Sequence, residues 1–211
     1  MHAYRHMRAY RRDIQAVCDS LVFNGQDSVM TMYHDPILWQ EGQQLLGEEI
    51  KAFFNDSTID SVQVLRQALS VERLDSIHYN QITGNEMHTY FRDGEVYLST
   101  SIGNVYVNYF HMGEDSILAD MNRTETTFLK IFLKDRKVDK IWMPAATGSF
   151  YPIPLIPADM LYVENFAWFD YVRPVDKHDI FEWRPKKAGS ELKKITRREA
   201  PKQKLSNIKK K

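Results

Sequence analysis

The side chains that could carry out acid–base or metal chemistry occur as pairs of neighbours in the sequence. They are Glu48-Glu49, Glu114-Asp115, His34-Asp35 and His178-Asp179. A glycosidase would be the best enzymatic interpretation, but it needs two carboxylates at a defined distance across one groove. Adjacent residues of a strand point to opposite faces, and the histidines lack the spacing of metal ligands. We therefore expect no catalytic residue, no metal and no cofactor.

A different chemistry, the binding of apolar chains, is indicated by a repeated pattern. Residues 50–56, 87–93 and 129–135 align on a terminal aspartate, with offsets of 37 and 42 residues. In each segment one alternating column is apolar or small, and the first position of the other column is polar. Since successive side chains of a strand point to opposite faces, each segment predicts a strand with one apolar face. Asp56, Asp93-Gly94 and Asp135 then predict hairpin turns.

The apolar column has two interpretations, ordinary core packing and contact with a lipid. Core packing explains any single residue without a ligand. Methionine and phenylalanine also suit an adaptable surface for flexible chains, and each methylene that they bury contributes about 0.8 kcal/mol. The candidates for the wall of a lipid groove are Leu21, Phe23, Ile50, Phe54, Val62, Met87, Phe91, Val96, Val105, Val107, Leu129, Ile131 and Leu133.

Short apolar–polar alternation, broken by Asn, Asp and Gly, is the main structural signal up to residue 142. It predicts strands at 14–24, 28–33, 49–54, 59–65, 76–80, 86–91, 95–99, 104–110, 128–133 and 137–142. Residues 62–74 could also be read as a helix, and we interpret them as strand. Strands at this spacing predict an all-β sheet stack, jelly roll or solenoid built from repeated hairpins. The first strand (7–12, 14–17) and the later strand 128–133 are expected to be edges that either receive a partner strand or are covered.

The composition divides the chain into a body and a tail. Residues 142–157 contain four prolines and predict an extended segment across an edge or end of the sheet. Residues 165–174 are rich in aromatic side chains and are expected to dock back on the body. We therefore predict one domain at 1–183, with a C-terminal extension at about 142–183, followed by a disordered basic tail at 184–211.

The net charge of zero is the sum of a body of −10 and a tail of +10. An acidic body argues against a generic nucleic-acid binder, whose folded domain would be basic. The tail could contact phosphates of anionic lipid or a membrane surface, or it could be a solvated extension. Its candidate contacts are Lys186, Lys187, Lys193, Lys194, Arg197, Arg198, Lys209, Lys210 and Lys211.

Other features of the sequence limit the class of protein further. The single cysteine, Cys18, excludes an internal disulfide framework. No run of about 18 apolar residues is available for a transmembrane helix. The basic N-terminus has no apolar stretch behind it, so the chain as written carries no export signal, and we expect it to be a truncated piece.

Several segments together resemble the OstA-like family of lipopolysaccharide-transport proteins, which is related to LptA and to the N-terminal part of LptD. The segments are residues 18–24, 27–33, 35–39, 44–51, with Gly-Glu-Glu-Ile at 47–50, and 102–105, with Gly-Asn-Val at 103–105. Residues 142–148 and 165–174 resemble the extra C-terminal portion of the Bacteroides-type members. The resemblance covers roughly residues 7–183. No single motif is specific to the family, and the resemblance rests on the order and spacing of these segments.

The resemblance implies an antiparallel β-jellyroll folded like a half-open taco, which shelters lipid acyl chains and stacks on other jellyrolls. It implies a non-catalytic role in outer-membrane biogenesis, in the periplasm of a Gram-negative bacterium or at the outer membrane. The expected partners are lipopolysaccharide or lipid A acyl chains, jellyrolls of the transport bridge or translocon, and a second copy head to tail, with no nucleic acid. The alternative is a structural β-repeat module that binds protein or polysaccharide and carries no lipid.

Overall fold

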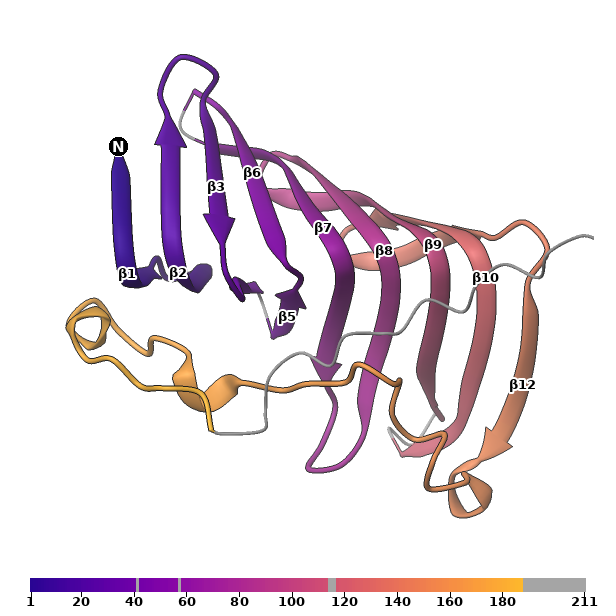
Figure 1. Cartoon of the computed structure of the whole chain (residues 1–211). Helices are drawn as coiled ribbons and strands as arrows, with labels where there is room; N and C mark the ends of the chain where they lie inside the picture. The colour runs from indigo at the N-terminus through magenta and orange to yellow at the C-terminus, as the bar shows by residue number, and fades with distance from the viewer. Residues whose placement is uncertain (41, 57, 114–116, 188–211) are drawn as a thin grey trace, which may run out of the picture.

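The computed structural model describes residues 1–40, 42–56, 58–113 and 117–187. In these residues the chain forms one sheet of twelve strands, all paired antiparallel, which confirms the predicted all-β jellyroll (Figure 1). The strands are β1 (His2–Tyr10), β2 (Ile14–Asn24), β3 (Val29–Tyr33), β4 (Ile37–Gln40), β5 (Gln43–Leu46), β6 (Glu49–Asn55), β7 (Thr58–Arg73), β8 (Tyr79–Arg92), β9 (Glu95–Met112), β10 (Leu118–Lys134), β11 (Lys137–Trp142) and β12 (Thr147–Pro152).

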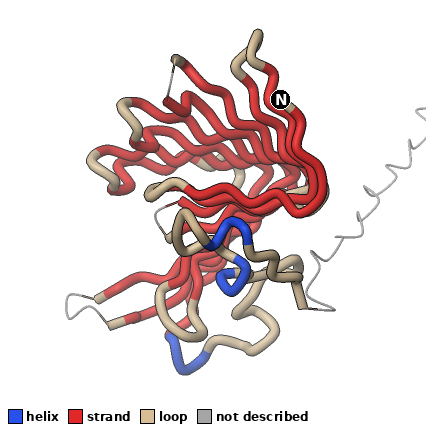
Figure 2. The backbone as a smooth tube through the Cα atoms, turned by 90° about the vertical axis from the view of Figure 1, so that its left-hand side faces the viewer, coloured by secondary structure: helices blue, strands red, loops and turns tan. Residues whose placement is uncertain are grey.

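The sheet folds on itself into two layers, which we call leaf A and leaf B (Figure 2). Each long strand contributes to both: β7 pairs with β6 through residues 58–65 and with β5 through residues 69–72. Leaf A holds β3, β6, β11 and the halves 58–65, 86–92, 95–102 and 128–134 of the long strands. Leaf B holds β4, β5, β12 and the halves 68–73, 79–84, 105–112 and 118–126. Because β7 pairs with both β5 and β6, the N-terminal half of the fold is closed around its circumference.

The crease between the leaves is a row of irregularities that crosses the long strands. The pairing register shifts between residues 65 and 68 of β7, 82 and 86 of β8, and 126 and 128 of β10. Arg66, Gln67, Gly103 and Asn104 have positive φ values there. A bulge of this kind adds a residue to one strand and bends it. The Gly-Asn-Val motif at 103–105 therefore marks a bend within one strand.

The predicted hairpin turns are confirmed at the ends of the three aligned segments. Asp93 and Gly94 join β8 to β9 with φ values of 53° and 81°, and Asp135 and Arg136 join β10 to β11 with 50° and 61°. Asp56 has a φ of 52° in the turn after β6. Positive φ at both central residues is the geometry that matches the twist of two-residue hairpins.

Most of the predicted strands are present, but several boundaries differ. Residues 62–73 are confirmed as strand, in β7, and Leu74 lies outside it. Residues 76–78 are not strand, and residues 79–80 and 86–91 belong to one strand, β8. Residues 95–99 and 104–110, predicted as two strands, are one strand, β9, because pairing on both sides continues the ladder through the bend at Gly103. The short strands β4 and β5 were not predicted, and they have only four residues each. The proline segment is extended over β12, which pairs with β10 at the edge of the sheet, but its residues 153–155 form a 3₁₀ helix.

Two clusters of buried side chains stabilise the fold. The first fills the space between the leaves in the closed half, with Leu21, Met32, Leu38, Ile50 and Val62 among its members. The second lies on the outer face of leaf B, where Trp39, Leu69 and Val71 pack under residues from the C-terminal part of the chain, including Val163, Phe169 and Val172.

The C-terminal part that covers leaf B is residues 153–187, which we call the strap. It contains three short 3₁₀ helices, η1 (Ile153–Leu155), η2 (Asp170–Val172) and η3 (Asp179–Phe181). It runs beneath the strands from β12 back toward β1 (Figure 1, orange to yellow). At its far end the carboxylate of Asp179 accepts hydrogen bonds from Arg8, at 3.3 Å, and from Arg184.

Buried amide side chains of leaf B bind the backbone of the strap. Gln44, Gln81 and Asn108 have no exposed surface. Each donates to a strap carbonyl, and two of them also accept from a strap N–H, so these backbone groups of the strap are satisfied although they lie against the sheet. The bonds are Gln44 to Ala167 O (2.9 Å), Phe169 N to Gln44 (2.8 Å), Gln81 to Leu161 O (3.0 Å), Val163 N to Gln81 (2.8 Å) and Asn108 to Met160 O (3.1 Å).

Candidate binding groove

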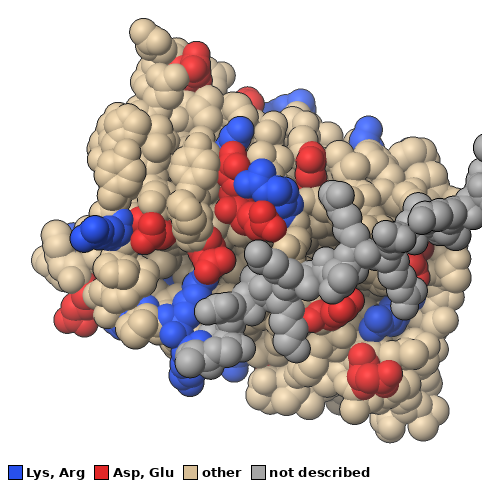
Figure 3. Space-filling model, viewed as in Figure 1, with Lys and Arg blue, Asp and Glu red and all other residues tan. Residues whose placement is uncertain are grey.

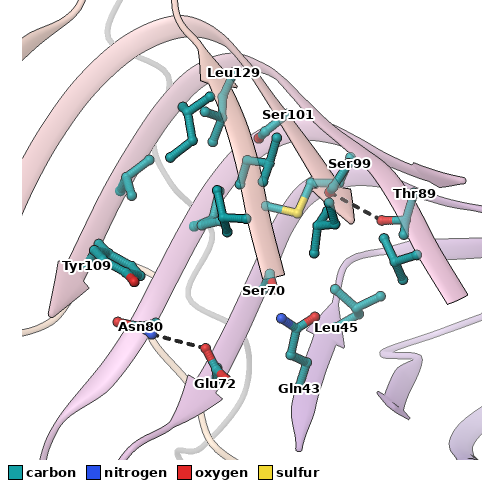
Figure 4. Close-up of a pocket in the computed structure, with 18 of the residues that line it drawn as sticks. Gln43, Leu45, Ser70, Glu72, Asn80, Thr89, Ser99, Ser101, Tyr109 and Leu129 are labelled. Carbon is teal, nitrogen blue, oxygen red and sulfur yellow. Dashed lines mark hydrogen bonds between the residues drawn. The ribbon is translucent and has the colours of Figure 1, made fainter. Parts of the chain in front are cut away.

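A groove of about 440 Å³ lies between the leaves, lined mainly by β7 to β11 and also by residues of β4 and β5 (Figure 4). The wall on leaf A is mainly apolar, and several of its residues alternate along one strand, β10, with side chains that face the other way. The apolar residues of this wall are Met87, Val96, Leu129, Ile131, Leu133, Val138 and Ile141. A continuous apolar surface of this kind gains free energy when an apolar chain covers it.

Small polar side chains form part of the groove lining. Ser70, Ser99 and Ser101 line the groove together with the large apolar residues named above. The Ser101 hydroxyl donates to the carbonyl of Thr83 at 2.8 Å, so it is satisfied within the protein.

Leaf B lines the groove with polar residues near its mouth. Glu72 accepts a hydrogen bond from the amide of Asn80 at 3.0 Å (Figure 4). The same Asn80 accepts from the backbone N–H of Phe110 at 2.9 Å. The ring of His111 lies 2.7 Å from a carboxylate oxygen of Asp120. These contacts hold the polar side chains in place along the ends of β7 to β10.

The predicted groove residues fall into two groups. Met87, Val96, Val107, Leu129, Ile131 and Leu133 line the groove, although Met87 also belongs to the packed cluster and Val96 packs against it. Leu21, Ile50, Val62 and Phe91 belong to the packed cluster of the closed half, and Phe23 and Phe54 pack against it. Val105 is fully buried on β9, beside the crease. The aligned repeats thus identified the residues that face the space between the leaves. The closure of the sheet decided which of these residues are packed in the cluster and which line the groove.

The groove also contains residues that were not among the predicted groove candidates. Leu45 and Ile82 lie on leaf B, and Val138 and Ile141 lie on β11. Ile82 precedes the second aligned segment, and Val138 follows the third, so neither is in the repeated column. The alternation of Ile82 with polar neighbours was the available signal, but it does not show which face of the strand is enclosed.

The carboxylate pair Glu48-Glu49 is engaged in an ion-pair cluster. Both side chains bind Arg66, each with an N–O distance of 2.9 Å. The prediction that adjacent carboxylates point to opposite faces is wrong here, because Glu48 precedes β6 and Arg66 lies at the bend of β7. On the face seen in Figure 3, lysine and arginine lie among aspartate and glutamate, and no patch of one sign is seen among the described residues.

The other predicted pairs have structural roles or lie outside the described residues. His34 and Asp35 both have positive φ values, at the turn between β3 and β4, and Asp179 binds arginine as above. Glu114-Asp115 lies outside the described residues. Within residues 1–40, 42–56, 58–113 and 117–187, no three His, Cys, Asp or Glu side chains are grouped as a metal site would require.

The free edges of the sheet are β1 at one end and β11 with β12 at the other. β1 pairs with β2, and β11 and β12 pair with successive halves of β10. Two predicted edges are therefore wrong: residues 14–17 lie between β1 and β4, and residues 128–133 are flanked by β9 and β11. Exposed apolar side chains, including Trp142 and Phe150, accompany the second edge.

The first two lysines of the predicted tail contact the body of the protein. The ammonium group of Lys186 lies 3.9 Å from a carboxylate oxygen of Asp35 and 4.8 Å from the centre of the Phe169 ring. The ammonium group of Lys187 lies 5.2 Å from the centre of the Tyr171 ring. The remaining tail residues predicted to contact anionic lipid, 193–211, lie outside the described residues.

No family model matches the chain, and no curated protein is significantly similar to it in sequence. Among solved structures, the chain is similar to LptH of Pseudomonas aeruginosa, described as the LptA-homologous periplasmic component of the lipopolysaccharide transport device. The match has 12% sequence identity and a TM-score of 0.47, and it covers 65% of this chain and 93% of that chain. In the part of the chain that the structure describes, no helix has the length and apolar character needed to cross a membrane.

Proposed function

We propose that this chain is a non-catalytic lipid-binding jellyroll that carries lipopolysaccharide, or its lipid A acyl chains, in outer-membrane biogenesis. The observation that carries the proposal is the apolar wall of leaf A, which faces an open groove while the other half of the same fold is packed. The groove volume of about 440 Å³ lies within the range of ligand sites, which is about 300–1,000 Å³.

The energetics of the groove favour an acyl chain. Each buried methylene contributes about 0.8 kcal/mol, so a few methylenes along Leu129, Ile131 and Leu133 contribute several kcal/mol. The binding of an acyl chain needs no reacting group. An open mouth along the strand ends allows a chain to enter and leave sideways, which suits a carrier.

The free edges support a second part of the proposal, assembly with similar jellyrolls. Within the described residues, β1 and β11 each pair with a strand on one side only, so their other sides can add a strand from a partner. Edge-to-edge stacking would align the groove of one domain with that of the next. The partners we propose are jellyrolls of the transport bridge or of the outer-membrane translocon, in the periplasm.

Site-specific photo-crosslinking tests the lipid proposal. Probes at Leu129 and Leu133, on the groove face of β10, should form adducts with lipopolysaccharide. The matched control is a probe at Lys130, which lies between them on the same strand and does not line the groove. A second control at Val62, in the packed cluster, reports labelling that follows from unfolding.

Adducts at Leu129 and Leu133 alone support the groove as the lipid site. Equal labelling at Lys130, or no labelling at any position, contradicts it. In that case the second candidate, a structural module that binds protein or polysaccharide, is favoured; the exposed apolar residues beside β11 and β12 are the observation in its favour.

A further inference from the structure

The two walls of the groove differ in chemistry, and the difference limits the kind of ligand. Leaf A contributes the apolar wall described above. Leaf B contributes a set of side chains that we call the polar rim, which can both donate and accept hydrogen bonds. Its members are Gln40, Gln43, Glu72, Asn80, Tyr109, His111 and Asn122.

The polar rim contains no lysine or arginine that could hold an anion. Among the described residues that line the groove, Arg136 is the only lysine or arginine. It lies on leaf A, where its guanidinium binds Glu95 at 2.9 Å. The polar rim itself contains the carboxylate of Glu72, and His111 has a second carboxylate, Asp120, at 2.7 Å. Among the described residues, a phosphate placed at the polar rim would face these carboxylates, with no lysine or arginine of the rim beside it.

We infer that the ligand's polar end is an uncharged, hydroxyl-bearing group such as a sugar ring, held by the polar rim while its apolar chain covers leaf A. This inference rests on the proposed lipid-binding function and adds the chemistry of the head to it. A sugar hydroxyl both donates and accepts, as do the carboxamides of Gln43, Asn80 and Asn122. Glu72 accepts from a hydroxyl without needing a counter-ion.

An aromatic surface at the rim suits the same kind of head. The side chain of Tyr109 is 44% exposed at the mouth of the groove, and its ring centre lies 5.0 Å from that of His111. A partly exposed tyrosine offers an apolar face and a polar tip at one place. Such a face can cover the C–H side of a sugar ring while the rim amides bind its hydroxyls.

Two amphiphiles with the same chain and different heads test the inference. Decyl maltoside and decyl phosphate are titrated into the full chain below their critical micelle concentrations, with calorimetry as the readout, and free maltose is the third ligand. We expect the maltoside to bind at least about tenfold more tightly than the phosphate, a difference of about 1.4 kcal/mol. Free maltose should bind much more weakly than decyl maltoside, because it lacks the apolar chain.

A charge reversal in the polar rim tests where the head lies. Glu72→Lys should strengthen decyl phosphate binding by about fivefold, the effect of roughly 1 kcal/mol from one exposed ion pair. Asp60→Lys is the matched control, since Asp60 is an exposed residue on the same strand, outside the groove. Glu72→Gln, which keeps the shape of the side chain, should retain maltoside binding and reduce the discrimination against phosphate.

The outcomes separate this inference from the proposed function. Decyl phosphate bound as tightly as the maltoside, or an equal gain in Glu72→Lys and Asp60→Lys, overturns the uncharged head and leaves the lipid groove standing. No binding of either amphiphile overturns the lipid groove itself. Free maltose bound as tightly as decyl maltoside overturns both, because the apolar wall then contributes nothing.

Discussion

The ionisation of the Cys18 thiol depends on the position of this residue in the packed half of the fold. It lies on β2 and is 2% exposed within the cluster between the leaves. Burial, with a smaller contribution from the charge of Asp19, raises the pKa of the Cys18 thiol to about 12. A thiol that does not ionise near neutral pH is neither a nucleophile nor a metal ligand. It acts here as a small apolar side chain.

The first prediction concerns the reactivity and pH dependence of this thiol. Cys18 should react with an aromatic disulfide reagent at pH 8 only as fast as the protein unfolds, and rapidly in urea. Because the folded thiol keeps its proton above the pKa of the unfolded one, its contribution to stability is full below about pH 9 and declines as the pH rises toward 12.

Urea titrations between pH 8 and 10.5, compared with Cys18→Ala, measure this contribution. The variant should lose less of its free energy of unfolding than the parent as the pH rises. Fast labelling of the native protein at pH 8 would show that the thiol is accessible and would contradict the prediction.

The crease is the feature of the strands on which the groove depends. Gly84 lies on β8 where the register of pairing with β9 shifts. A Cβ atom placed there would lie 2.3 Å from the hydroxyl of Ser101 and 3.1 Å from the carbonyl of Glu86. The bend therefore brings the two strands closer than any side chain allows.

The second prediction is that Gly84→Ala destabilises the protein by about 2 kcal/mol, as overpacking of a tight site does. Urea unfolding measures the change. Gly25→Ala is the matched control, since the nearest atom to its added Cβ is 3.9 Å away, and it should shift the free energy of unfolding by less than about 0.5 kcal/mol. Equal effects at the two glycines would refute the role of the crease.

The strap runs across the outside of leaf B from β12, at one edge of the sheet, to β1, at the other edge. Its buried hydrogen bonds to Gln44, Gln81 and Asn108 fix its path, and Asp179 binds Arg8 of β1 at its far end. With leaf B supported from outside, the groove on its inner side needs no packed core to hold its shape. This arrangement explains how one half of the jellyroll can be closed and packed while the other is open.

The third prediction compares a large side chain in the two halves. Leu133→Trp enlarges a side chain that lines the open groove, so it should leave the free energy of unfolding nearly unchanged while blocking decyl maltoside binding. Val62→Trp enlarges a residue that is 1% exposed in the packed half, and overpacking should cost about 1–3 kcal/mol. Urea unfolding and calorimetry measure the two effects. Loss of stability in Leu133→Trp equal to that in Val62→Trp would mean that the groove is not open space.

Much of the strand pattern could be predicted from the sequence, because alternation and turn residues are local signals. The aspartate at the end of each aligned segment predicted a hairpin turn that the structure contains. Asp and Gly adopt the positive φ values that such a turn needs, as Asp93 and Gly94 do. The strands β4 and β5 could not be predicted, because four residues are too few to show a period. The single strand β9 could not be predicted either, because the bend at Gly103 resembles a turn in the sequence.

The sequence by itself determined which residues face inward, because side chains alternate along a strand whatever its partners are. It did not determine which of them form a core and which line a groove. Ile50 and Leu129 occupy the same column of the repeat, yet Ile50 lies in the packed cluster and Leu129 lines the groove. Tertiary structure decided this, because the volume left between two leaves depends on which strands close the sheet and on the side chains that meet across it. Those pairings join residues far apart in the chain, and no local pattern records them.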